Sequence, residues 1–304
     1  MKNLKLKKLK YCKICGSLDL KNISEVKNKI TISRIKTKLF LIECKSCLHR
    51  TFSKLPSNSQ LTKAYTNNDP LVWGLLQNEP HNNQKKNNNY NFSKIKPLYN
   101  HWIFKHLNID KKKNYFELGP GAFNLYKTFH NKGWKCYGIE PNSFIKAPGI
   151  KKKFNEINVK ADISVATDVL EHVNNPVVYL KNINSIMKKN GKIFLTFPHS
   201  QSFKSRYLKD KWSMVAPFGH VNFFSKISTA IMLKKSNFKL VLIKDFSYVE
   251  KKRLTRNILK LPIYLIKDLI TLNLKNFIQR IEESILNILD LINGDQLMVV
   301  AVKL

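Results

Sequence analysis

The sequence predicts an α/β protein with a mostly parallel sheet and helices on both of its faces, preceded by a small cysteine-rich unit. Residues 111–140 form an apolar segment, a glycine turn, an amphipathic segment and a second apolar segment. This is the pattern of a βαβ unit that binds a nucleotide-type ligand at its strand ends. Apolar runs then alternate with helical patterns as far as residue 302. Two C-x-x-C pairs precede this region, between residues 12 and 47.

The chain has an unusual charge balance. Its 304 residues include 54 Lys and Arg against 20 Asp and Glu, which gives a net charge of +34. Such a charge fits an anionic partner: nucleic acid, a phosphorylated substrate or a membrane surface. The basic residues are spread along the chain, which favours solvated faces and compositional bias as the source of most of the charge. Either interpretation is compatible with a small anionic substrate.

Three features predict a cytoplasmic protein without a membrane span. No segment reaches the roughly 18 uninterrupted apolar residues of a transmembrane helix. The basic residues 1–10 are not followed by the apolar core of a secretory signal. Four of the five cysteines stand in C-x-x-C pairs, which suits a reducing compartment better than a disulfide framework.

The cysteine pairs predict a zinc-ribbon-like domain at residues 1–55. Two thiolates separated by two residues bind a metal from a tight turn, and two such turns complete a tetrahedral structural zinc site. The 28 residues between the pairs exceed the usual spacing of roughly 15–20, and an apolar strand within residues 30–43 absorbs the excess. A redox C-x-x-C or unpaired core thiols are the alternatives, and neither explains two pairs. The predicted ligands are Cys12, Cys15, Cys44 and Cys47.

Residues 56–97 are predicted to be a connector or a lid. The polar, low-complexity run HNNQKKNNNYN at 81–91 predicts a loop, and residues 61–76 predict a short helix. The remaining residues, 98–304, then form the α/β domain.

The glycine turn after the first strand of that domain has chemical consequences. Gly119 and Gly121 let the backbone turn sharply and let a ligand approach closely. Glu140 follows Gly119 by 21 residues, near the spacing of about 20 expected for a carboxylate that binds ribose hydroxyls. Asn124 stands where a dinucleotide site requires a third glycine. Glu117, just before the turn, would repel a phosphate and suits a cation.

These residues resemble motif I of the class I S-adenosylmethionine (SAM) methyltransferases. That motif reads acid-x-Gly-x-Gly, here Glu117-Leu118-Gly119-Pro120-Gly121. Residues 161–173 end in Asp-Val-Leu-Glu-His-Val and resemble the fourth strand of the family and the signature after it. Residues 189–198 resemble its lysine–glycine turn and fifth strand. The resemblance covers residues 98–304.

The resemblance implies a Rossmann-like, seven-stranded methyltransferase sheet with SAM as cofactor. It assigns the methionine part of SAM to Glu117 and the turn with Gly119 and Gly121. It assigns the ribose to Glu140. Asp168, after the fourth strand, is then expected to line the cofactor or the mouth of the substrate pocket.

The other elements follow from periodicity. Strands are predicted at 114–117, 135–140, 162–168, 192–197, 238–246 and 297–302, and helices at 99–107, 122–132, 176–188 and 226–236. The third strand must be short because only 21 residues separate Glu140 from Asp162, and we assign it to 154–157. Residues 199–225 form an insertion that would cover the pocket.

Residues 253–292 predict two helices. Isoleucines recur at helical spacing in the second of them, which indicates an apolar face. We expect an amphipathic cover over the sheet. The alternative is contact with a membrane surface, suggested by the basic, apolar run 253–274; acidic residues in both helices weaken it.

Two histidines are candidates for the general base that an oxygen or carbon acceptor requires. His172 follows the fourth strand, at the sheet edge where ligands bind. His220 ends the insertion. The alternatives are structural: a helix-start histidine and a loop histidine, each bonded to the backbone.

A four-cysteine ribbon ahead of a SAM domain resembles the sugar C-methyltransferases and their relatives, which act on nucleotide-linked sugars. This implies a nucleotide-linked sugar or a surface-glycan precursor as acceptor. That group has a Glu-His pair late in the chain, where this chain has Gly219-His220. One alternative is an RNA or protein methyltransferase that binds through the ribbon, but no N-P-P-Y-type tetrapeptide follows the fourth strand. The other is a non-catalytic SAM fold, suggested by the short stretch 141–161.

Overall fold

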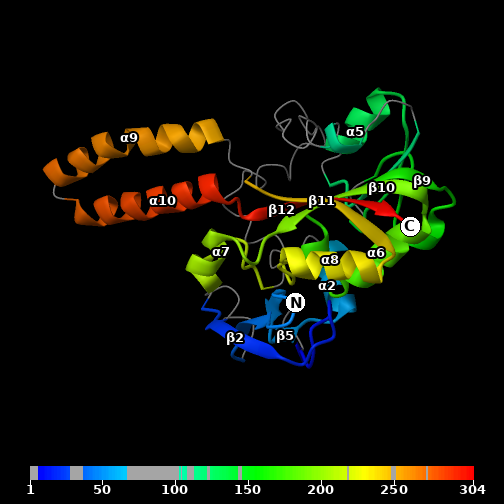
Figure 1. Cartoon of the computed structure of the whole chain (residues 1–304), viewed down its shortest axis with the longest axis horizontal. Helices are drawn as coiled ribbons and strands as arrows, with labels where there is room; N and C mark the ends of the chain where they lie inside the picture. The colour runs from blue at the N-terminus through cyan, green and yellow to red at the C-terminus, as the bar shows by residue number, and fades with distance from the viewer. Residues whose placement is uncertain are drawn as a thin grey trace.

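The computed structural model describes residues 6–27, 37–66, 103, 105–107, 113–121, 124–142, 146–217, 219–247, 251–271 and 273–304. Within them, a seven-stranded sheet forms the centre of the molecule (Figure 1). Most of the predicted connector lies outside these ranges, and its described part includes α2, Asn58–Thr66.

The sheet has the strand order β11-β12-β10-β9-β6-β7-β8. Neighbours from β10 to β8 are parallel, whereas β12 is antiparallel to β10 and β11. The strand order reverses between β6 and β9, and ligands bind at such a switch point in open α/β sheets. The strands are β6 Asn114–Leu118, β7 Lys135–Ile139, β8 Ile150–Lys151, β9 Ala161–Thr167, β10 Met187–Pro198, β11 Phe238–Phe246 and β12 Gln296–Lys303.

Helices cover both faces of the sheet, as predicted. α6 (Pro176–Ser185) and α8 (Lys226–Lys235) bury Leu180 and Leu233 in a core with residues of β10 and β12. On the other face, Phe129 of α5 (Asn124–Asn131) stacks on Tyr115 of β6, with ring centroids 3.9 Å apart. The sequence sets the start of α8, because Ser225 caps it by accepting from the Ser228 amide.

The cysteine-rich unit contains a three-stranded antiparallel sheet of β2 (Leu20–Glu25), β3 (Phe40–Cys44) and β4 (Arg50–Phe52). β3 accounts for part of the strand predicted within 30–43, and residues 28–36 lie outside the described ranges. A small ladder pairs β1 (Lys7–Lys8) with β5 (Lys54–Leu55).

The insertion after β10 packs against this unit. It contains α7 (Phe203–Leu208) and the 3₁₀ turn η5 (Lys209–Lys211). Phe52 of β4 shares a buried core with Trp212 and Phe223 of the insertion. Arg50 and Phe223 exchange two backbone hydrogen bonds, of 3.0 and 2.9 Å, so the two segments pair like short antiparallel strands.

Two sequence predictions about element boundaries are wrong. The third strand is β8, Ile150–Lys151, which pairs with Gly138 and Ile139; residues 154–156 form a 3₁₀ turn instead. The helix predicted at 176–188 ends at Ser185, because β10 already begins at Met187 and pairs there with Ala161.

The predicted helical cover over the sheet is also wrong. α9 (Lys251–Ile270) and α10 (Leu274–Ile292) form a hairpin that projects away from the sheet (Figure 1). Large apolar side chains on both helices stay exposed, among them Ile263 and Ile278. Among the described helices, none is long and apolar enough to cross a membrane.

Candidate active site and cysteine cluster

The glycine turn follows β6 at the switch point of the sheet. Gly119 has a φ of +65° and Gly121 a φ of +47°, a region that glycine adopts without steric cost. The Gly119 amide donates to the Ile139 carbonyl oxygen at 2.9 Å, which fixes the turn to the end of β7. A Cβ on Gly119 would lie 2.7 Å from Cγ2 of Val169. The turn therefore touches the segment that follows β9.

Glu117 and Glu140 flank this turn, and both are buried. Glu140 accepts hydrogen bonds from the amides of Gly121 (3.3 Å) and Asn142 (3.0 Å). Glu117 accepts from the Tyr115 hydroxyl at 2.9 Å. Burial raises the pKa of Glu140, and burial with the nearby charge of Glu140 raises the pKa of Glu117 to about 8. Two carboxyls that are costly to ionise would both gain from a cationic ligand.

Asp168 lies directly after β9 and adopts a φ of +54°, which is uncommon outside glycine. Its amide donates to the Thr196 carbonyl oxygen at 3.0 Å, and the Thr196 hydroxyl donates to its Oδ1 at 3.0 Å. Both bonds tie Asp168 to β10. The side chain therefore lies at the sheet edge that also carries the glycine turn.

The structure brings the two candidate histidines together. The rings of His172 and His220 meet edge to face, with centroids 4.7 Å apart. His172 Nδ1 lies 2.7 Å from the Gly219 carbonyl oxygen, and His220 Nδ1 lies 2.9 Å from that of Met214. Because a carbonyl oxygen only accepts, each Nδ1 carries the hydrogen in the neutral ring. His172 has a second backbone hydrogen bond, with Asp168.

Burial lowers the pKa of both histidines. The pKa of His172 falls below its usual value, and that of His220 falls to about 3 because the neighbouring His172 adds to the effect of burial. Both imidazoles are therefore neutral near pH 7, the form that accepts a proton.

Glu171 is a third member of this cluster that sequence reasoning did not single out. Its side chain is buried and its Oε2 has no hydrogen-bond partner among the described residues. Burial raises its pKa well above the usual range, and the charge of Asp168 adds to this. Glu171, His172 and His220 offer ligand-type atoms that all lie within 4.8 Å of one another. The sequence signal that could have identified Glu171 is a carboxylate that stands between apolar residues and next to a histidine.

Backbone bonds hold the cluster in place. The amides of Val221 and Asn222 donate to the Glu171 carbonyl oxygen at 2.7 and 3.1 Å. The Asn222 side chain donates to the carbonyl oxygens of Leu170 and Val173. These bonds attach the end of the insertion to the 3₁₀ turn η4, Leu170–His172, and so place His220 beside His172.

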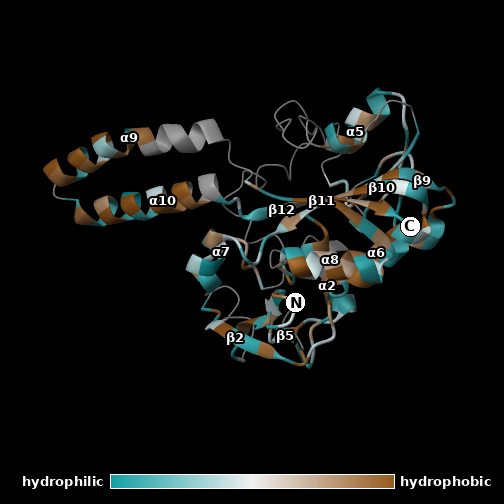
Figure 2. Ribbon diagram, in the orientation of Figure 1, coloured by the Kyte–Doolittle hydropathy of each residue, from teal (hydrophilic) through white to brown (hydrophobic). Residues whose placement is uncertain are grey.

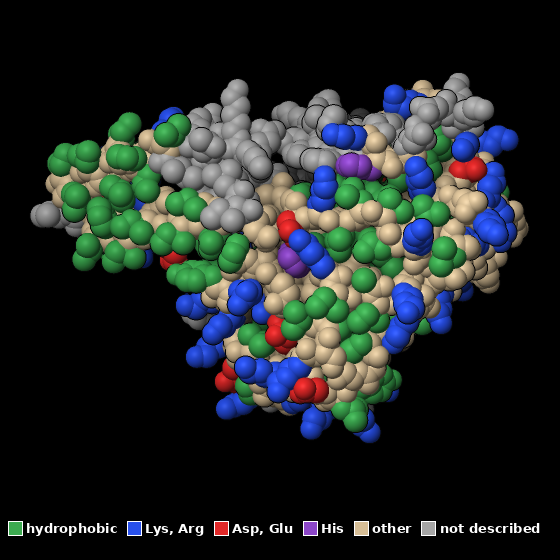
Figure 3. All heavy atoms as spheres, viewed as in Figure 1, with side chains coloured by type: hydrophobic (Ala, Val, Ile, Leu, Met, Phe, Trp, Pro, Cys, Tyr) green, Lys and Arg blue, Asp and Glu red, His purple; other side chains and the backbone are tan. Residues whose placement is uncertain are grey.

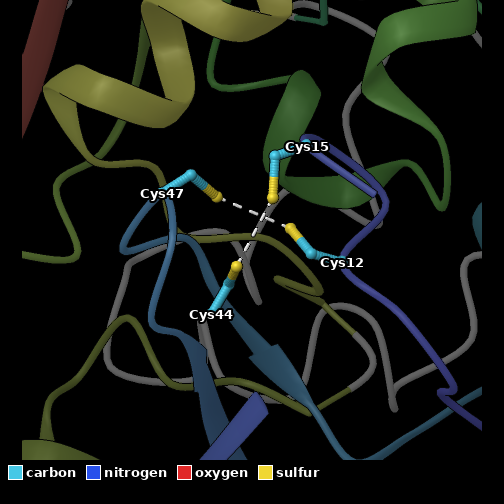
Figure 4. A group of neighbouring side chains, drawn as sticks. All are labelled: Cys12, Cys15, Cys44 and Cys47. Atoms are coloured by element: carbon cyan, nitrogen blue, oxygen red, sulfur yellow. Dashed lines mark hydrogen bonds between the residues drawn. The ribbon is translucent and has the colours of Figure 1, made fainter. Parts of the chain in front are cut away.

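The four cysteines of the predicted metal site converge (Figure 4). The Sγ atoms of Cys12 and Cys47 are 3.6 Å apart, and those of Cys15 and Cys44 are 3.5 Å apart. Zn–S bonds of about 2.3 Å in a tetrahedron separate sulfurs by about 3.8 Å. All four are free thiols, so the donor set fits one tetrahedral metal ion.

Both C-x-x-C turns have the same backbone geometry. The Gly16 amide donates to the Cys12 carbonyl oxygen at 2.8 Å, and the Leu48 amide donates to that of Cys44 at 2.7 Å. Gly16 and Leu48 occupy equivalent places and both have positive φ, +93° and +58°. The two turns thus present their thiols as two similar halves of one site.

The family follows from this fold and from a family-model match. Strand order, glycine turn and flanking acids define an α/β protein whose switch point suits a nucleotide-type ligand. A methyltransferase-domain family model matches residues 89–243, which is half of the chain, and the chain belongs to this family. This confirms the predicted class, a SAM-dependent methyltransferase with a four-cysteine cluster ahead of it.

Comparisons with other proteins give only distant likenesses. No curated protein matches the chain. It is similar to a chain of the complex between the Haloferax volcanii Trm112 methyltransferase activator and a putative methyltransferase (10% identity, TM-score 0.47, 80% of this chain and 97% of the other). It is similar to the [4+2]-cyclase SpnF (11% identity, TM-score 0.49, 82% of this chain and 97% of the other). A third similar structure is phosphoethanolamine N-methyltransferase 2 of Haemonchus contortus (14% identity, TM-score 0.45, 84% of this chain and 63% of the other).

Proposed function

We propose that this methyltransferase moves a methyl group from SAM to a small anionic acceptor, a nucleotide-linked sugar or a surface-glycan precursor. The observation that carries the proposal is the cluster of Glu171 and the neutral pair His172 and His220. It lies beyond the end of β9, beside the segment that contacts the glycine turn. A deprotonating group next to a cofactor turn is what methylation of a hydroxyl or an activated carbon requires.

The residues around the glycine turn fit SAM. When bound, SAM supplies an electrophilic methyl group on a sulfonium cation. Glu140 binds the ribose hydroxyls, and Glu117 and the Gly119 turn bind the methionine part. The raised pKa of Glu117 supports this assignment, because a positive charge nearby offsets the cost of ionising the buried carboxyl.

His172 is the proposed general base. Its imidazole would take the proton of the acceptor group, while SAM would supply the methyl group and leave as its demethylated product. His220 has a pKa of about 3, so it is a poor base near neutral pH. We therefore assign it a positioning role: its ring packs on that of His172 and holds it in place.

Glu171 supports a sugar-type acceptor. The sugar C-methyltransferases have a carboxylate next to a late histidine, and Gly219 stands there in this chain. Glu171 brings a carboxyl to His220 from a different segment. With its raised pKa, the carboxyl favours the protonated form, which donates a hydrogen bond to a hydroxyl or keto oxygen.

The four cysteines hold, in this proposal, a structural zinc ion. All four ligands come from the protein, so no position stays open for catalysis. The metal would stabilise the unit that pairs with the insertion. Ser225, at the end of the insertion, donates to the Cys47 carbonyl oxygen at 2.6 Å, and the Thr51 hydroxyl donates to that of Val221 at 2.7 Å.

An acceptor screen tests the proposal. Zinc-loaded protein and methyl-labelled SAM are incubated with nucleotide-diphosphate sugars in one reaction and with total RNA in another. The methylated product is identified by mass spectrometry. We expect label on a sugar, lost in His172→Ala. Label on RNA alone would overturn the sugar acceptor and favour the alternative, an RNA methyltransferase. Tight SAM binding without transfer to any acceptor would favour a non-catalytic protein.

A further inference from the structure

We propose that the α9–α10 hairpin docks this protein on an anionic membrane surface, where it lies among the lipid headgroups without crossing the bilayer. This goes beyond the proposed function and does not depend on it. The proposal rests on the far end of the hairpin, residues 259–281, which we call the distal hairpin. It combines exposed apolar side chains and exposed lysines, and its one acid, Asp268, is buried; the exposed Glu282 follows directly after the distal hairpin.

Large apolar side chains of the distal hairpin are exposed to an unusual extent. In α9, Leu259, Ile263, Ile266 and Ile270 are 73%, 68%, 59% and 77% exposed. Their spacing of four, three and four residues places them on one side of the helix. Figure 2 shows apolar colouring along the coloured parts of both helices of the hairpin. Contiguous exposure of this kind on a water-soluble domain marks an interaction surface.

The charges of the distal hairpin are complementary to anionic lipid. Its only acid is Asp268, which is 4% exposed and accepts from Arg280 Nε at 2.6 Å. The exposed charges are those of Lys260, Lys267 and Lys275. Lysine stems lie along apolar surface while their ammonium groups reach outwards. The three lysines can therefore bind lipid phosphates while the neighbouring apolar side chains insert into the lipid.

The placement of the apolar residues favours lipid over a second protein. The stripe with Ile263 lies on the side of α9 opposite Asp268, which faces α10 through its bond to Arg280. A second stripe, Leu274, Ile278 and Ile281, lies on α10. The apolar surface therefore extends over both helices around the tip, as the green end of the hairpin in Figure 3 illustrates. A lipid interface can cover the apolar sides of both helices at once, whereas a rigid partner covers one face.

The composition of α9 excludes a span and fits the interface. Its 20 residues carry six Lys or Arg and one Asp, and neither described helix of the hairpin qualifies as a membrane span. A helix with an apolar face and a basic polar face lies in the plane of an anionic surface. α9 is about 30 Å long at 1.5 Å per residue, and the hairpin projects away from the central sheet (Figure 1).

Vesicle sedimentation tests the proposal. The full-length protein is mixed with vesicles of phosphatidylcholine alone or with phosphatidylglycerol added, at low and high salt. The test variant replaces Ile263, Ile266 and Ile270 by Ser, which leaves the net charge unchanged. The matched control replaces three exposed apolar residues of the body, Val178, Ile227 and Val241, by Ser. Circular dichroism of both variants checks that they fold.

We expect the wild-type protein and the control to sediment with anionic vesicles and to keep part of this binding in high salt. The hairpin variant should lose about tenfold or more in partitioning, because three apolar side chains no longer insert. Equal binding of all three proteins, abolished by salt, would show attraction of the charged body alone and overturn the proposal. So would a dimer in lipid-free solution that the hairpin variant loses, which would assign the surface to a second copy.

Discussion

The rings of His172 and His220 meet edge to face with centroids 4.7 Å apart, although they come from different segments of the chain. Each Nδ1 is bonded to a backbone carbonyl oxygen, and burial keeps both rings neutral near pH 7. This contact joins the segment after β9 to the end of the insertion.

Replacing the two histidines should have unequal effects. We expect His172→Ala to lower kcat by about 10²–10⁴-fold, the usual contribution of a general base. His220→Ala should cost less, because it disturbs the orientation of His172 without removing the base. Steady-state kinetics with the acceptor found in the screen measures both. The affinity for SAM, which our proposal assigns to Glu117, Glu140 and the Gly119 turn, serves as the control. A larger loss of kcat in His220→Ala would reverse the two roles.

SAM binding should depend on pH through Glu117. Its pKa in the free protein is about 8, and a bound cation favours the ionised form. Affinity should therefore rise as pH increases from 6 to about 8 and level off above, with proton release on binding. Calorimetry in buffers of different ionisation enthalpy measures both quantities. Affinity that does not change over this range, or that falls, would contradict the assignment of Glu117 to the cofactor site.

Glu117→Gln should stabilise the protein and weaken its binding of SAM. Between its unfolded pKa near 4.5 and about 8, the folded state holds a proton that the unfolded state has lost. The free energy of unfolding therefore falls as pH rises through this window. Gln removes this slope and should raise the free energy of unfolding at pH 8 by about 1–3 kcal/mol. Denaturant unfolding at pH 6 and pH 8 measures it; an unchanged slope would count against a buried, protonated Glu117.

Gly119 is required for two separate reasons. Gly119→Ala should lose SAM affinity and about 1–2 kcal/mol of stability from the positive φ alone, with a further loss from the clash with Val169. Gly121→Ala is the matched control, since its φ is also positive but a Cβ there would lie 3.9 Å from the nearest described atom, the Gly119 carbonyl oxygen. Adding Val169→Ala should restore part of the stability of Gly119→Ala in thermal unfolding. No rescue would mean that the clash does not contribute.

Metal analysis should find one zinc per chain. Cys44→Ser should lose it and unfold the cysteine-rich unit, because classical four-ligand sites contribute folding energy directly. Activity should fall with it, since Arg50 and Phe223 tie this unit to the segment that carries His220. Cys136→Ser, outside the cluster, is the control. A second metal ion that survives Cys44→Ser and is lost in Glu171→Gln would assign a cation to the histidine cluster and displace the base mechanism.

The sequence predicted the features that depend on local pattern. The glycine turn with Glu117, the two C-x-x-C turns and six of the seven strands follow from residues close together in the chain. β8 was missed because Ile150 and Lys151 form a strand only through pairing with Gly138 and Ile139; two residues carry no periodicity. Tertiary pairing, not propensity, determines such a strand.

Features that depend on distant residues were not predictable in the same way. The spacing of the isoleucines in α10 shows that an apolar face exists but not what covers it, so the hairpin was wrongly placed over the sheet. The proximity of Glu171 to His220 arises from the backbone bonds of Val221 and Asn222, which no local pattern encodes. Each histidine was a candidate by position, but only the fold brings them together.

Calorimetric titration of the zinc-loaded protein with SAM, and with its demethylated product, tests the central claim most directly. The account predicts micromolar binding of both, lost in Glu140→Ala and retained in His172→Ala. A well-folded protein that binds neither compound would contradict it and would leave the fold without its cofactor.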